Sequence, residues 1–173
     1  MKYLDRFANI ATLIAVAVFL VLAARGDFSR RTVKIANPSI AVVGTTITLP
    51  GVQWPVKQDT LVLGISASCH FCRDSLPFYK ELAARLKGKV NVIAVLPQQQ
   101  KEADAFIEGA GIAGVKVVSQ NLGSIGVYAT PTLLLVDGSG KVKASWVGDL
   151  DAERQRKVIA AVLPAGAAVV PRS

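Results

Sequence analysis

Short apolar runs alternate with amphipathic stretches over most of the chain. Runs with the length of buried strands predict strands at residues 61–65, 90–96, 115–118 and 132–136. A turn at residues 137–140 leads into a further strand at 141–147, which is predicted to pair antiparallel with the strand before it.

Apolar residues spaced three and four positions apart predict helices at 73–87, 101–108 and 151–163. The first of these helices should begin at or near Cys69, and Asp151 is the expected N-cap of the last. Strands that alternate with helices and close with an antiparallel pair predict an α/β fold with a mixed central sheet flanked by helices.

Two segments precede the first of these strands. Residues 40–49 alternate β-branched residues around Gly44 and Thr45, which predicts a short N-terminal β-hairpin ahead of the main fold. Residues 51–59 have the composition of a loop.

A long uncharged run occupies residues 7–24. As a helix it would be about 27 Å long, close to the hydrocarbon thickness of a bilayer, so it predicts one transmembrane helix. Lys2 and Arg6 precede it, a pattern that membrane anchors share with cleaved signal peptides. A buried core helix is the remaining alternative, although a helix that is apolar on every side needs much protein around it.

The basic residues around this run point in two directions. More of them follow the run than precede it, and the positive-inside rule alone would place that side in the cytoplasm. A short N-terminal tail normally stays inside, so we expect the main domain to be extracytoplasmic, on the periplasmic side. The predicted divisions are a tail at 1–6, an anchor or signal at 7–24, a linker at 25–39, a domain at 40–163 and a flexible tail at 164–173.

The chain has two cysteines, Cys69 and Cys72, which lie too close together in sequence to staple distant segments. At the start of a helix, the first thiol lies near unsatisfied backbone N–H groups and the positive end of the helix dipole, which stabilise its thiolate. Cys69 is therefore the expected nucleophile and Cys72 the resolving thiol. His70, the single histidine, could further favour the thiolate.

The composition also raises two other possible functions, metal binding and nucleic-acid binding. A structural zinc site needs about four ligands, and two cysteines and one histidine fall short of that number. A copper site built from Cys69, Cys72 and His70 stays open. The net charge is +8, but the basic residues are scattered and aromatic residues make up only 6% of the chain, so we expect no nucleic-acid partner.

Two motifs resemble the thioredoxin-like superfamily. The first is the run 61–72, which ends in Cys-His-Phe-Cys, with Pro77 five residues later; the second is the run 126–142, which contains Thr130-Pro131. The resemblance covers roughly residues 40–163 and implies a thioredoxin fold. It also implies that Pro131 is cis and lies against the cysteines, and that the Thr130 backbone hydrogen-bonds an extended substrate segment.

The N-terminal features narrow the resemblance. The predicted hairpin and membrane segment resemble the membrane-anchored extracytoplasmic branch related to cytochrome c maturation thioredoxins. The chain departs from the superfamily at Ser68, where tryptophan is frequent, and at His70-Phe71, where Gly-Pro or Pro-Pro is frequent. Leu63 stands where a buried acidic or amide residue is expected.

The predicted function is a thiol–disulfide oxidoreductase that acts on protein thiols and disulfides without a cofactor or metal. One alternative is a peroxiredoxin-like peroxidase, in which Ser66 would replace the usual threonine although Val62 stands where a proline belongs. The other is a membrane-held copper carrier that uses the two cysteines and His70.

Overall fold

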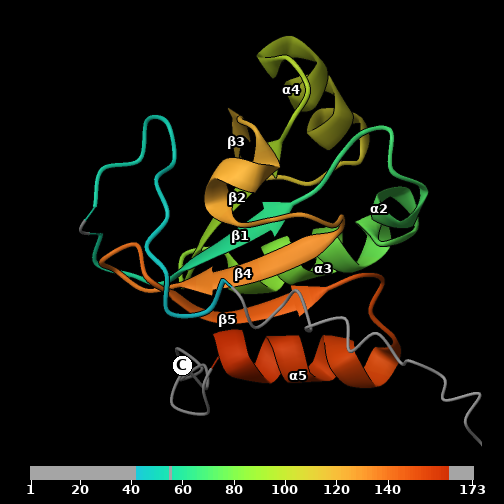
Figure 1. Cartoon of the computed structure of the whole chain (residues 1–173). Coiled ribbons are helices and arrows are strands. Elements are labelled where there is room, and N and C mark those ends of the chain that lie inside the picture. Colours follow the sequence, from blue (N-terminus) through green and yellow to red (C-terminus); the bar gives the residue numbers. More distant parts are fainter. Residues whose placement is uncertain (1–41, 55, 164–173) are drawn as a thin grey trace, which may run out of the picture. The chain divides into compact units, whose positions relative to one another are not determined.

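The computed structural model describes residues 42–163 with the exception of residue 55. A five-stranded mixed sheet has the order β3-β2-β1-β4-β5 (Figure 1). Its strands are β1 (Thr60–Gly64), β2 (Asn91–Leu96), β3 (Lys116–Ser119), β4 (Thr132–Val136) and β5 (Val142–Val147). β1 pairs parallel with β2 and antiparallel with β4, so the predicted mixed sheet is confirmed.

The helices are α2 (His70–Asp74), α3 (Leu76–Leu86), α4 (Gln100–Gly109) and α5 (Ala152–Val162), together with the 3-10 helix η1 (Leu122–Ile125). The side chain of Asp151 accepts a hydrogen bond from the Arg154 N–H at 2.8 Å, which confirms it as the N-cap of α5. No pattern in the sequence predicted η1.

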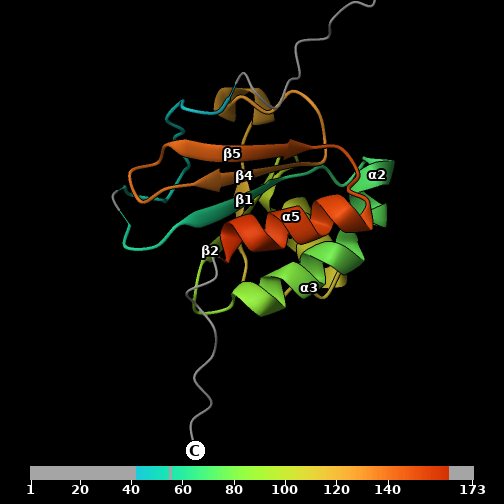
Figure 2. The same ribbon diagram turned by 90° about the horizontal axis from the view of Figure 1, so that it is seen from below.

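Each face of the sheet has its own core. β1 shows the reason, because all of its residues are buried and alternate ones point to opposite faces. Leu61 and Leu63 belong to the cluster that includes residues of α2, α3, α4 and α5, whereas Val62 belongs to the cluster that includes residues of η1 and segment 42–49. Figure 2 shows α3 and α5 side by side beneath the sheet.

The predicted single helix at 73–87 is in fact two helices. α2 ends before Ser75, and α3 begins at Leu76 with Pro77 in its first turn. Pro77 has no N–H to donate, and its ring would clash with the carbonyl of Arg73 in a continuous helix. The break therefore gives the short helix that carries Cys72 its own direction.

The predicted hairpin at 40–49 is wrong for the residues that the structure describes. Thr46 instead forms an isolated antiparallel bridge with Lys141. The Gly44 N–H donates to the carbonyl of Val142 at 2.8 Å, so this segment pairs with the start of β5 rather than with itself.

Within residues 42–163, no helix has the length and apolarity needed to cross a bilayer. The predicted transmembrane run at 7–24, the linker at 25–39 and the C-terminal tail lie outside the described residues.

The strand registers bring three chain segments to one edge of the sheet. Gly64, the last residue of β1, pairs with Val95 near the end of β2 and with Thr132, the first residue of β4. The loop before Cys69, the loop after β2 and the loop ending at Pro131 therefore meet there. This edge holds the candidate site.

Candidate active site

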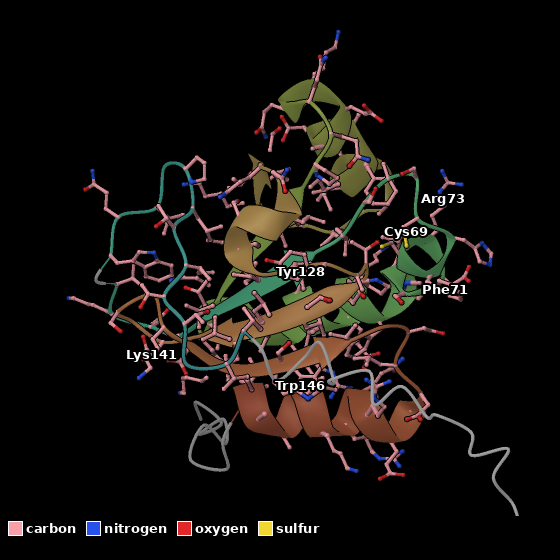
Figure 3. The ribbon with its side chains drawn as sticks, in the orientation of Figure 1. Cys69, Phe71, Arg73, Tyr128, Lys141 and Trp146 are labelled. Atoms are coloured by element: carbon pink, nitrogen blue, oxygen red, sulfur yellow. The ribbon has the colours of Figure 1, made fainter. Side chains whose placement is uncertain are left out.

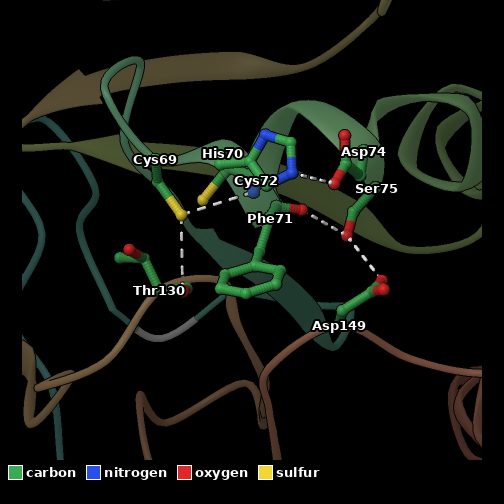
Figure 4. A network of polar contacts seen from close by, with 8 residues as sticks. All are labelled: Cys69, His70, Phe71, Cys72, Asp74, Ser75, Thr130 and Asp149. Atoms are coloured by element: carbon green, nitrogen blue, oxygen red, sulfur yellow. Dashed lines mark hydrogen bonds and ion pairs between the residues drawn. The ribbon is translucent and has the colours of Figure 1, made fainter.

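Cys69 lies between the sheet and α2. Its backbone N–H donates to the carbonyl of Ser66 at 3.1 Å, and its Sγ, as the N-cap atom of α2, accepts the N–H of Cys72 at 3.3 Å (Figure 4). The sulfur thus takes the place that a serine or aspartate oxygen has in an ordinary helix cap. A negative charge on this atom would be stabilised by the same N–H group.

Cys72 lies one helical turn later and is fully buried, whereas Cys69 is partly exposed. Both are free thiols, and Figure 4 shows their sulfur atoms beside each other. The Sγ of Cys72 accepts the backbone N–H of Ser66 at 3.5 Å. The Cys69 thiol can therefore contact another molecule, whereas the Cys72 thiol can contact only Cys69.

The surroundings shift the two thiols in opposite directions. Burial alone would raise the pKa of Cys69, but hydrogen bonds from the Cys72 side chain, the Thr130 side chain and the backbone of Cys72 and Phe71 outweigh it, so the pKa is lowered. Burial raises the pKa of Cys72 to about 12, with further contributions from its hydrogen bond to Cys69 and the charge there. Cys69 is thus the thiol that ionises first.

The loop before β4 faces Cys69. The Thr130–Pro131 peptide bond is cis, and the carbonyl of Thr130 accepts a hydrogen bond from the Sγ of Cys69 at 3.5 Å. Two bonds hold this loop: the hydroxyl of Thr132 donates to the carbonyl of Ala129 at 2.7 Å, and Gly148 N–H donates to the carbonyl of Pro131 at 2.8 Å. The backbone beside the sulfur is therefore fixed.

The two residues between the cysteines point outward. The Nε2 of His70 lies 3.1 Å from the Oδ2 of Asp74, and its side chain is 79% exposed. Among the described residues no hydrogen bond joins His70 to either sulfur, so its predicted role at the thiolate has no contact to support it. Phe71 is 57% exposed and packs edge-on against the His70 ring.

The loop that leads to Pro131 carries an exposed aromatic residue. Tyr128, two residues before Thr130, is 80% exposed, and Figure 3 shows its position relative to Cys69 and Phe71. Phe71 and Tyr128 are the two most exposed large hydrophobic residues among those that the structure describes.

Several residues of the site escaped the sequence analysis. Gln98, in the loop after β2, hydrogen-bonds the Ser66–Ala67 loop through both atoms of its amide. Arg73 donates to the carbonyl of Ala67 at 2.8 Å, and the hydroxyl of Ser75 lies 3.2 Å from the Oδ1 of Asp149. The only signal was the run of small polar residues before Cys69, which predicts a tightly hydrogen-bonded loop but not its partner.

The geometry bears on the two alternative functions. Within residues 42–163, no three His, Cys, Asp or Glu side chains gather into a group that could hold a metal ion. The hydroxyl of Ser66 lies 3.0 Å from that of Ser68 and accepts from Gln98 at 2.9 Å. No hydrogen bond of the described residues joins this hydroxyl to the Cys69 sulfur, and the peroxidase alternative stays a prediction.

Solved structures resemble this one, although no protein-family model and no curated protein matches the sequence. A thiol-disulfide isomerase from Corynebacterium glutamicum is 15% identical with a TM-score of 0.55, over 70% of this chain and 97% of that one. A Chlorobium tepidum protein provisionally assigned as the thiol:disulfide interchange protein DsbE is 22% identical with a TM-score of 0.53, over 70% and 99%.

A third similar structure is the thioredoxin domain of a thiol-disulfide oxidoreductase from Bacteroides vulgatus, which is 17% identical with a TM-score of 0.50, over 69% of this chain and 99% of that one. At these identities the likeness concerns the fold. The features of this chain that belong to that fold are the strand order, the helix that begins after Cys69 and the cis peptide bond before Pro131. The described part of this chain therefore has the thioredoxin fold.

Proposed function

We propose that the protein is a thiol–disulfide oxidoreductase in which Cys69 is the nucleophile and Cys72 the resolving thiol. The observation that carries this proposal is the asymmetry of the pair. The more exposed sulfur accepts a helix N-terminal N–H and has a lowered pKa, whereas the buried sulfur has a raised one. An exchange that begins at one defined thiol requires this difference.

The reaction needs only the two cysteine sulfurs, a substrate disulfide and proton exchange with water. The Cys69 thiolate attacks one substrate sulfur, the substrate S–S bond breaks, and the second substrate sulfur leaves as a thiolate that takes a proton from water. The Cys72 thiolate, having lost its proton to solvent, then attacks the Sγ of Cys69 and releases the first substrate sulfur. The substrate gains two electrons and the cysteine pair becomes a disulfide; the reverse sequence oxidises a dithiol.

A protein is the proposed substrate. The Thr130 backbone lies beside Cys69, where an extended segment of another chain could add hydrogen bonds like those of a sheet edge. Phe71, between the two cysteines, and Tyr128, in the loop that leads to Pro131, offer exposed aromatic surface. Together these features suit a polypeptide that presents a cysteine between apolar residues.

We also propose that residues 7–24 anchor the protein in a membrane and that the redox domain lies on the extracytoplasmic, periplasmic side. The uncharged run of this length supports the anchor. An oxidising compartment is where a reversible dithiol of this kind would meet substrate disulfides.

Equilibration of the full chain with glutathione buffers, followed by trapping of free thiols, tests the proposed function. We expect one reversible two-electron transition, with a potential between the roughly −270 mV of thioredoxin and the roughly −120 mV of strong oxidants. The variants Cys69→Ser and Cys72→Ser should both lose it. If the wild-type chain forms no reversible disulfide, the proposed oxidoreductase function is contradicted. Stoichiometric Cu(I) binding by that chain would then favour the copper-carrier function.

A further inference from the structure

The loop between β1 and Cys69 has no free backbone group at its centre. The N–H of Ser66 donates to the Sγ of Cys72 at 3.5 Å, and its carbonyl accepts from Cys69 at 3.1 Å. The N–H of Ala67 donates to the Oε1 of Gln98 at 3.3 Å, and its carbonyl accepts from Arg73 at 2.8 Å. The loop is therefore held at every polar backbone atom of these two residues.

Among the described side chains, Gln98 is the one that holds this loop from the segment after β2. Its Oε1 accepts from Ala67, while its Nε2 donates to the hydroxyl of Ser66 at 2.9 Å. The parallel register explains the contact, because Gly64 pairs with Val95 and the residues that follow each strand run side by side. The loop of Gln98 is itself fixed, since the hydroxyl of Ser119 donates to the Gln98 carbonyl at 2.5 Å.

The Ser66 N–H matters for the second step of the proposed reaction. Cys72 is buried and must become a thiolate before it attacks Cys69. Among the described residues, Ser66 supplies the only backbone N–H that donates to the Cys72 sulfur. A fixed donor at this distance stabilises the thiolate, whereas a mobile one must first be ordered.

We propose that Gln98 is a positioning residue for the resolving step: it clamps the Ser66–Ala67 loop so that the Ser66 N–H stays on the sulfur of Cys72. This inference rests on the proposed function. The loop holds the backbone of Cys69 through the Ser66 carbonyl, but it supplies an N–H donor only to the sulfur of Cys72. The N–H on the Cys69 sulfur comes from Cys72 within α2.

The test uses the reduced full chain and the chromogenic disulfide 5,5′-dithiobis(2-nitrobenzoate). Attack by Cys69 releases a first equivalent of thionitrobenzoate and leaves a mixed disulfide; attack by Cys72 on that mixed disulfide releases a second. The two phases therefore report the two steps in one trace. In Gln98→Met, which has similar length but no hydrogen-bonding amide, the two part-buried hydrogen bonds to the Ser66–Ala67 loop are lost. We expect the second phase to slow about fivefold. The first phase should stay within about twofold of the wild type.

Gln100→Met is the matched control. Gln100 begins α4 and also bonds through both amide atoms, with Nε2 donating to the carbonyl of Val117 at 3.2 Å and Oε1 accepting from Ser119 at 3.1 Å. These bonds reach β3 and not the cysteine loop. The control should lose comparable thermal stability while both phases keep the wild-type rates.

Ser66→Ala keeps the backbone N–H and removes only the hydroxyl that Gln98 holds. It should slow the second phase by less than Gln98→Met does, and it serves as a second variant if Gln98→Met folds poorly. Wild-type second-phase rates in both variants, or an equal slowing of both phases that Gln100→Met shares, would overturn the role of Gln98. A wild-type chain with no second phase would instead remove the proposed function, and this inference with it.

Discussion

The Sγ of Cys69 lies 3.5 Å from the carbonyl oxygen of Thr130, although 61 residues separate the two in the chain. The antiparallel pairing of β1 with β4 produces this closeness, because Gly64 at the end of β1 faces Thr132 at the start of β4. A molecule joined to the Cys69 sulfur must therefore lie against the backbone next to Pro131. The sheet register thus fixes both the reactive atom and the surface that a partner meets.

Alkylation of the reduced chain should modify Cys69 and spare Cys72 near neutral pH. Because its pKa is lowered, Cys69 keeps a larger thiolate fraction than an ordinary cysteine as the pH falls, whereas Cys72, with a pKa of about 12, stays protonated. Mass spectrometry after iodoacetamide treatment across a pH series gives the midpoint for each site. A Cys69 midpoint at or above that of a free cysteine would contradict the assigned asymmetry.

Phe71→Ser should slow exchange with protein disulfides and leave exchange with a small disulfide nearly unchanged. The Phe71 ring is exposed, and its carbonyl, which accepts the hydroxyl of Ser75, is kept in the variant. The substitution therefore removes the proposed partner contact without opening the core. Loss of a buried interface aromatic costs about 1–2 kcal/mol, which corresponds to a roughly 5- to 30-fold lower kcat/KM toward a protein substrate. The comparison is the reduction rate of insulin against that of oxidised glutathione.

Equal slowing with both substrates would place Phe71 in the chemistry of the cysteines rather than in partner contact. Val43→Ser is the control, because Val43 is also an exposed apolar residue but lies in segment 42–49 rather than beside Cys69.

Gly126→Ala should destabilise the fold more than Gly88→Ala does. Both glycines have positive φ, 73° and 76°, which costs an alanine about 1 kcal/mol. At Gly126 a Cβ would also lie 2.6 Å from the Cγ2 of Val42, whereas nothing lies within 4 Å at Gly88. Urea unfolding should show a loss of about 2–3 kcal/mol for the first variant and about 1 kcal/mol for the second.

Equal losses of unfolding free energy in the two variants would show that segment 42–49 does not pack on η1 as described. The same comparison tests the loop that leads to Pro131, because Gly126 is both the C-cap of η1 and the first residue of that loop.

The strands were predictable because their signal is local. The run at 61–65 is apolar throughout, as a central strand buried on both faces must be, and it coincides with β1 to within one residue at each end. The segment around Gly44 and Thr45 has the same β-branched character, but its partner is Lys141, and the pattern within one segment does not say with which strand it pairs.

The cysteine pair was predictable from two sequence motifs, but the residues that hold it in place were not. Pro77 was visible in the sequence, yet the helical spacing of apolar residues continued across it and hid the break at Ser75. Gln98 is one of three consecutive glutamines, and only the register of β1 with β2 selects it for the cysteine loop. The contact of His70 with Asp74 was not visible in the sequence, and a role for His70 at the thiolate stays a prediction.

The most direct test of the account is to react Cys72→Ser and Cys69→Ser, each in the reduced full chain, with a disulfide-bonded protein and to separate the products on non-reducing gels. If Cys72 is the resolving thiol, as proposed, Cys72→Ser should accumulate a covalent complex that dithiothreitol reduces, and Cys69→Ser should form almost none. Complexes of equal yield from both variants, or a complex only from Cys69→Ser, would contradict the assignment of Cys69 as the nucleophile.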